Sequence, residues 1–242
     1  MEPPSGLRSN LMRAYANLDN RELNDCTKPK EFKMLLFAFS FFHAIAQDRR
    51  KFGAIGWNIP YAFMQEEFTV CKIQLKSFLD EYDDVPYKVL NFLGADVNYG
   101  GRVTDDKDIR LIKCILERFV QPDTINVGFN FSDSGLYKTI EPGSQEDYIK
   151  YIDSLPLVPG PEAFGLHENA EITTNQENTR LILAHVLSVQ PRTSSGGGKS
   201  REEVIGEISK SIEDQTPVHY DMDNVMEKYP TLYNESMNTV LA

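Results

Sequence analysis

The chain has few of the residues that build disulfide frameworks, metal clusters or membrane spans. Its 242 residues include three cysteines, four histidines and one tryptophan. Cys26, Cys71 and Cys114 are an odd number and lie far apart, which argues against a disulfide framework and favours a reducing, intracellular setting. No segment reaches the roughly 20 apolar residues of a membrane helix, and the nearest, residues 34–46, runs directly into charged residues. We therefore expect no membrane partner.

Basic residues are also fewer than acidic residues. The sequence has 36 Asp+Glu against 25 Lys+Arg, a formal net charge of −11. A field of this sign repels acidic polymers, so we expect no nucleic-acid partner. The 41% hydrophobic and 25% charged content is typical of a globular protein with a real core.

Helical spacing of apolar residues dominates what is present. The predicted helices span residues 7–18, 32–46, 66–82, a short stretch after Pro86, 104–122, 144–155, a long segment ending before Pro191, and two or three within 200–242. The second is apolar nearly all round and should form the core. Thr104 and Ser144 are predicted to cap the helices that follow them. Residues 126–137 alternate around a Ser134-Gly135 turn, which predicts a small β-hairpin or a loop excursion.

Trp57 is the first candidate site residue. It lies in residues 51–61, where two glycines and a proline interrupt the helical pattern. Its neighbours are apolar, so a packing anchor is favoured over a ligand platform. Asp105, Asp106 and Asp108 stand near a helix start, where carboxylates are stabilised, and capping is favoured over metal binding there.

The segment Gly196–Ser200 imitates a phosphate-binding loop, with Lys199 as the candidate phosphate ligand. The motif requires glycine where this sequence has Thr193, and the preceding apolar run has helical rather than strand spacing. A flexible linker is therefore favoured over nucleotide binding. The four histidines form no pair with metal-ligand spacing, and no nucleophile stands beside a plausible base. We assign no catalytic, nucleotide-binding or metal-binding residue.

Five runs of the sequence together resemble the dynein heavy chain near its C-terminus. They are residues 32–61, 75–108, 161–173, 196–204 and 228–241. In that region of the family, the sixth AAA+ module of the motor ring gives way to the C-terminal domain. The start of the chain is similar to the end of that module's large subdomain. GWNIPY at 56–61 and SMNTVL at 236–241 resemble axonemal rather than cytoplasmic heavy chains.

The resemblance implies a mainly α fold. It divides the chain into the end of the AAA+ large subdomain and a connector at 1–30, a helical AAA+ lid at 31–172, and the first helices of a C-terminal helical domain at 173–242. A full domain of that kind continues past SMNTVL, so we expect a truncated piece of a longer protein.

The resemblance implies that the chain is part of a motor protein. Dynein heavy chains are ATP-driven, microtubule-based motors of cilia and flagella, and their sixth module lacks a working nucleotide site. We therefore expect a non-catalytic lid that binds no cofactor, with ATP and Mg serving the full-length motor. The expected partners are neighbouring AAA+ modules and the C-terminal domain of the same chain, with intermediate chains, light chains and microtubules contacted elsewhere. The expected location is the cytoplasm and cytoskeleton, in the ciliary or flagellar axoneme.

One residue role follows from the resemblance. In AAA+ lids an arginine near a helix start often reaches a bound nucleotide as a sensor, and Arg102 has a similar setting. The hypothesis is a degenerate sensor that now holds a subdomain interface by charged hydrogen bonds. Two alternatives stay open: a free-standing nucleotide-binding protein using Gly196–Ser200, and an interaction module derived from a dynein fragment. The second would show an exposed apolar patch around Phe41, Trp57 or the Tyr229–Leu241 helix.

Overall fold

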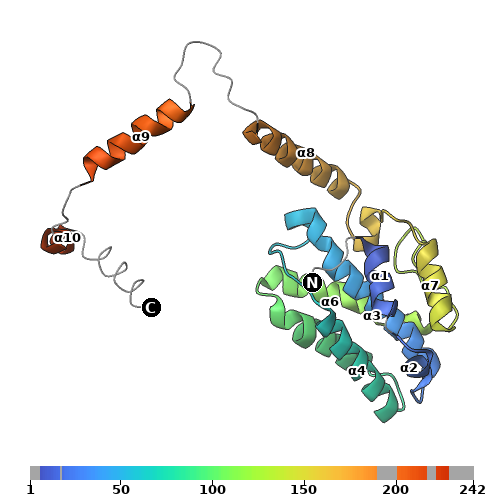
Figure 1. Ribbon diagram of the computed structural model, residues 1–242. Coiled ribbons are helices and arrows are strands. Elements are labelled where there is room, and N and C mark those ends of the chain that lie inside the picture. The colour runs from blue at the N-terminus through green and yellow to red at the C-terminus, as the bar shows by residue number, and fades with distance from the viewer. Residues whose placement is uncertain (1–5, 17, 190–200, 217–221, 229–242) are drawn as a thin grey trace. The chain divides into compact units, whose positions relative to one another are not determined.

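The computed structural model describes residues 6–16, 18–189, 201–216 and 222–228 (Figure 1). The chain divides into two compact units, Met1–His185 and Val186–Ala242, which we describe separately. The described residues form a mainly helical structure, which confirms the predicted fold class. None of the described helices combines the length and the apolar character that a membrane span requires.

The first unit is built around α3 (Pro29–Asp48). Every residue from Met34 to Asp48 is buried, because apolar side chains occur on all sides of this helix. Helices α1 (Leu7–Ala16), α4 (Gln65–Glu81) and α6 (Asp106–Phe119) pack on it, and α7 (Gln145–Ser154) packs on α1 (Figure 1). The predicted core helix is thus confirmed as the centre of the bundle.

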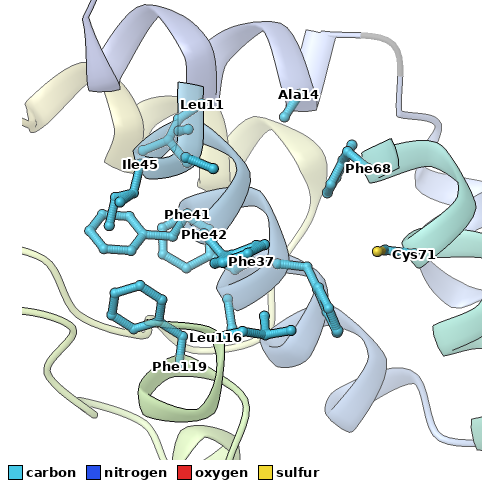
Figure 2. Close-up of a cluster of buried hydrophobic side chains, with 14 of the residues drawn as sticks. Leu11, Ala14, Phe37, Phe41, Phe42, Ile45, Phe68, Cys71, Leu116 and Phe119 are labelled. Atoms are coloured by element: carbon cyan, nitrogen blue, oxygen red, sulfur yellow. The ribbon is translucent and has the colours of Figure 1, made fainter. Parts of the chain in front are cut away.

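Aromatic rings fill the space between α3 and its neighbours. Phe41 of α3 meets Phe119 of α6 edge-on, with ring centroids 5.3 Å apart, and lies 4.9 Å from Phe131. Figure 2 shows Phe37, Phe41 and Phe42 of α3 among side chains from α1, α4 and α6. Edge-to-face pairs of this kind add about 0.5–1.5 kcal/mol each beyond the area they bury. The bundle is therefore held by a continuous aromatic core.

Shorter elements connect these helices. The remaining elements of the first unit are α2 (Asn20–Asn24), η1 (Arg49–Ile55), α5 (Tyr87–Asn91), the π-helix η2 (Phe92–Tyr99), η3 (Gly100–Arg102), η4 (Pro122–Ile125) and η5 (Pro161–Phe164). The long helix α8 (Asn169–Val189) follows η5 and ends in the second unit, and α9 (Arg201–Gln215) and α10 (Met222–Lys228) belong to that second unit. The predicted long helix before Pro191 is confirmed by α8.

The predicted β-hairpin at 126–137 is not formed. Within the described residues this segment has one isolated antiparallel bridge, between Asn130 and Lys138, and no strand. The two sides still share backbone hydrogen bonds, from the Phe131 N–H to the Tyr137 carbonyl at 2.7 Å and from the Thr139 N–H to the Phe129 carbonyl at 2.9 Å. The Phe129 N–H, however, donates to the Thr139 hydroxyl at 2.9 Å instead of to a carbonyl of the opposite side. The segment is a loop whose Phe131 and Tyr137 are buried.

The two predicted caps have different outcomes. Ser144 is the N-cap of α7, as predicted, and the Asp147 carboxylate accepts its N–H at 2.8 Å and its hydroxyl at 2.7 Å. The cap of α6 is Asp105, not Thr104, and its carboxylate accepts the N–H groups of Lys107 and Asp108 at 2.9 and 3.1 Å. A charged acceptor makes the stronger hydrogen bond to those N–H groups, so the helix begins one residue later than predicted.

Candidate functional site

The buried charged side chains of the described residues gather around one loop. We call residues 49–64, which join α3 to α4, the Trp57 loop. Within the described part of the chain, four charged residues are buried, and each contacts this loop: Asp48, Arg49, Glu67 and Asp108. Burying a charge is costly unless it is hydrogen-bonded or paired. Four such groups at one loop mark it as the best-defined polar site of the bundle.

Arg49 is the central cation of this site and is 2% exposed. Its Nε donates to the Gly56 carbonyl at 3.1 Å, and its Nη1 donates to the carbonyl of Phe164. The guanidinium carbon lies 5.4 Å from the centre of the Trp57 ring, within the range of a cation–π contact. Burial lowers the pKa of Arg49 to about 10, against the attraction of Asp108, so the group stays charged at neutral pH.

Gly56 allows the backbone to approach Arg49 this closely. A Cβ atom at position 56 would lie 1.9 Å from the Arg49 carbonyl oxygen. No side chain fits there without moving the backbone of the loop. The glycine in the GWNIPY motif is thus required by packing within the chain.

Trp57 is enclosed by the chain itself. Its indole N–H donates to the Ala46 carbonyl at 3.0 Å. The rings of Tyr61 and Phe63 meet it edge-on, at centroid distances of 6.1 and 5.7 Å. The indole therefore joins the loop to the last turns of α3, with both its apolar body and its single donor in use.

Asp105 and Asp108 tie the loop to the start of α6. The buried carboxylate of Asp108 accepts the backbone N–H groups of Asn58 at 3.1 Å and Ile59 at 3.3 Å. Asp105 accepts from the Asn58 side-chain amide at 3.0 Å, and this hydrogen bond is the main cause of its lowered pKa. The first-turn aspartates thus brace a segment about 50 residues away as well as the helix. Helical periodicity and capping rules carry no signal for that second role.

Arg102 pairs with a carboxylate of its own bundle. It ends η3 and forms an ion pair with Glu67 in the first turn of α4. The Arg102 side chain is 46% exposed, whereas the Glu67 side chain is 6% exposed. Glu67 also accepts the Met64 N–H at 2.8 Å, and so holds the end of the Trp57 loop. The pair therefore links the segment before α6 to the start of α4.

The charged groups of this site take part in hydrogen bonds and ion pairs within the chain. Its buried carboxylates are occupied by backbone N–H groups or by cations, and the described residues contain no group of three or more His, Cys, Asp or Glu side chains that could hold a metal. Two open cavities lie outside the loop's buried polar contacts. One, of about 420 Å³, is lined by residues of α5, η2 and α6, and the other, of about 210 Å³, lies between Phe52 and the first turns of α8.

The remaining sequence candidates do not join this site. The Gly196–Ser200 segment with Lys199, and the Tyr229–Leu241 segment, lie outside the described residues. Phe41 and Trp57 are both buried and contribute no exposed apolar surface, whereas Ile55, Ile59 and Met64 of the Trp57 loop are 41–45% exposed. Further exposed apolar side chains follow one another on the later turns of α8. The sequence predicted Arg102 and Trp57 as candidates and missed Arg49, Glu67 and the bracing role of Asp108.

Comparison with known proteins gives consistent matches. The family model of the dynein heavy chain AAA lid domain matches residues 32–170, and the model of the C-terminal domain of dynein heavy chains matches residues 176–242. Dynein axonemal heavy chain 1 of Homo sapiens is 48% identical over 242 residues, which are 100% of this chain and 6% of that protein. Dynein axonemal heavy chain 3 of Mus musculus is 44% identical over 99% of this chain and 6% of its own length. Dynein axonemal heavy chain 12 of Homo sapiens is 40% identical over 99% of this chain and 8% of its own length.

Proposed function

The chain belongs to the dynein heavy chain family, and from this premise we propose that it is a non-catalytic lid of the motor ring. The lid is that of the sixth AAA+ module, and it packs in the ring and relays conformational change. The observation that carries the proposal is the match of the AAA lid family to residues 32–170. The buried charges of that segment support it, because they are committed to the chain's own backbone and side chains.

The proposal extends to the organisation of the chain. Residues 1–30 are the end of the large subdomain and a connector, residues 31–172 are the lid, and residues 173–242 begin the C-terminal domain. The family matches at 32–170 and 176–242 support a change of domain near these boundaries. Trp57 acts as a packing anchor inside the lid.

The activity of the whole motor is proposed through the relatives, of which the chain spans only 6–8%. The full-length heavy chain is an ATP-driven, microtubule-based motor of the ciliary or flagellar axoneme, and it uses ATP and Mg. This segment binds neither, and it contacts neighbouring AAA+ modules and the C-terminal domain of the same chain. Intermediate chains, light chains and microtubules are contacted through other regions. The net charge of −11 supports the last point, because it disfavours contact with the acidic microtubule lattice.

Calorimetric titration of the purified chain with ATP and ADP, in the presence of magnesium, tests the non-catalytic role. We expect no heat of binding at millimolar nucleotide. Binding that disappears in Lys199→Ala would contradict the proposal and support a nucleotide site at Gly196–Ser200. Lys210→Ala, a lysine of α9 outside that segment, is the matched control for the loss of one positive charge.

For Arg102 we infer an interface role in place of nucleotide sensing. Its ion pair with Glu67 supports this, because the cation already serves a carboxylate of the same lid. Arg102→Ala should lower the free energy of unfolding by up to about 1 kcal/mol, since the arginine is half exposed and solvent screens the pair. Urea unfolding measures the change, and Arg110→Ala, an exposed position of α6, is the control. Equal stability of the Arg102→Ala and unsubstituted chains would remove the interface role.

A further inference from the structure

Helix α8 has an unusually weak attachment to the bundle. It spans 21 residues, of which Ala170 is the single buried one among the described side chains. Of its other described side chains, Thr174 is half-buried and the rest are exposed, so deep packing does little to hold its direction relative to the bundle. That direction therefore depends on the residues immediately before the helix, which are η5 and the turn through Gly165.

Arg49 holds this turn from the side of the bundle. The carbonyl that it binds belongs to Phe164, the last residue of η5, and Gly165 follows with a φ of 66°. Phe164 is buried, and its ring meets Phe52 of η1 edge-on at 5.2 Å. The Lys51 ammonium lies 4.3 Å from the Phe164 ring centre and 4.9 Å from that of Phe52. Arg49, Lys51 and Phe52, which follow the end of α3, thus all contact Phe164, the residue just before the chain turns toward α8.

The charge of Arg49 makes this contact specific. Within the described residues no carboxylate lies within ion-pair distance of its guanidinium. Its partners are the two carbonyls, of Gly56 and Phe164, and the face of Trp57. A buried guanidinium without a paired anion depends on such donor contacts, and losing one leaves donors unsatisfied in the interior. One side chain therefore joins the end of α3, the Trp57 loop and the last residue of η5, five residues before α8.

We propose that Arg49 is the positioning residue that fixes the direction in which α8 leaves the bundle, so that movement at the end of α3 is passed to α8. The inference deepens the proposed relay function, on which its mechanical meaning rests. At 1.5 Å per residue α8 is about 30 Å long, so a tilt of about 10° at its start moves its far end by about 5 Å. A small change at the Arg49 contact is thereby amplified.

A pair of spin labels on the 242-residue chain tests this. One label is placed on Cys114, which is exposed on α6, and the other on Ala184→Cys of α8, with Cys26→Ser to leave buried Cys71 as the remaining thiol. We expect a narrow distance distribution in the chain with Arg49, and a distribution at least two-fold broader in Arg49→Met, which keeps much of the side chain's bulk but no donors. Arg49→Lys should broaden it less, because one ammonium still reaches a carbonyl. Arg50→Met, at the exposed neighbouring position, should leave it narrow.

A second label pair separates positioning from general packing. Cys114 and Ile73→Cys, an exposed position of α4, report on the bundle alone. Equal broadening of both pairs in Arg49→Met would overturn the proposal, as would no broadening of the α8 pair. If Arg49→Met does not fold, Arg49→Lys is compared in its place, and loss of the bundle in both variants also overturns it, because Arg49 would then hold the whole bundle. No nucleotide is used, so the outcome is independent of the calorimetric test.

Discussion

His43 lies in the middle of α3 and is 1% exposed. Its Nδ1 is 2.7 Å from the Tyr99 hydroxyl, and its ring stacks on Phe68 with centroids 5.4 Å apart. A histidine on an apolar helix is a core residue more often than a ligand, and these neighbours fit the core role. Because burial disfavours the charged imidazolium, the pKa of His43 falls from 6.5 to about 3.

This lowered pKa predicts a loss of stability in acid. As the pH falls below about 6.5 the unfolded chain binds a proton at His43 and the folded chain does not, so the free energy of unfolding decreases by up to about 1.4 kcal/mol per pH unit until about pH 3. We compare urea unfolding of the unsubstituted chain and His43→Gln. The stability difference between them should shift by about 2 kcal/mol between pH ~7.5 and ~5, in favour of the variant at low pH.

The comparison cancels the titration of the carboxylates, which both chains share. His167→Gln, at an exposed position that contacts the Asn169 N–H, removes a histidine outside the core and serves as the control. A stability difference between His43→Gln and the unsubstituted chain that does not vary with pH would show that His43 titrates alike in the folded and unfolded states.

At the scale of elements, the π-helix η2 is the feature that periodicity did not predict. The apolar residues after Pro86 indicated a short helix, and the structure continues that helix from α5 into the wider turns of η2. Gly94 of η2 explains the close packing there. A Cβ atom at this position would lie 2.6 Å from Leu116 Cδ2 of α6 and 3.4 Å from Phe39 Cε1 of α3. The π-helix is thus seated against the core of the bundle.

Gly94→Ala is expected to destabilise the bundle. The added methyl group overpacks a core in which Leu116 is fully buried, so the free energy of unfolding should fall by about 1–3 kcal/mol. Gly101→Ala is the matched control, because a Cβ atom there meets nothing within 4 Å. The control should be neutral or stabilise by up to about 1 kcal/mol, since alanine restricts the unfolded chain. Denaturant unfolding measures both, and equal stability of the two variants would contradict the packing argument.

At the scale of the whole molecule, the later turns of α8 expose several large apolar side chains close together in sequence. Leu181, Ile182, Leu183, Val186 and Leu187 are between 47% and 68% exposed. Contiguous apolar patches on a surface commonly mark interaction sites. This fits a segment that works inside a larger assembly, as proposed for the motor ring.

The exposed apolar face predicts self-association of the isolated chain. Ile182→Lys combined with Leu187→Lys should reduce association in sedimentation velocity, because it places charge in the patch. Gln176→Lys combined with Thr179→Lys adds the same charge to an exposed polar part of α8 and should leave association nearly unchanged. A concentration-independent monomer in the unsubstituted chain would contradict the prediction, and equal effects of both pairs would indicate net charge as the cause.

The sequence by itself determined the helices, the core and the family. The apolar spacing of residues 32–46 predicted the buried centre of the bundle, Ser144 predicted the start of α7, and the motifs indicated the dynein heavy chain. These signals are local, because helix periodicity and capping act over a few residues of chain.

Only the tertiary structure decided the partners of the buried charges. Arg49 binds a carbonyl 115 residues away, Asp108 binds N–H groups about 50 residues away, and Arg102 pairs with Glu67. The predicted hairpin at 126–137 is likewise reduced to one isolated bridge, where the Thr139 hydroxyl accepts the Phe129 N–H. A buried charge must be satisfied within about 3 Å, and which distant group comes that close depends on how the helices pack. No pattern along the chain contains that information.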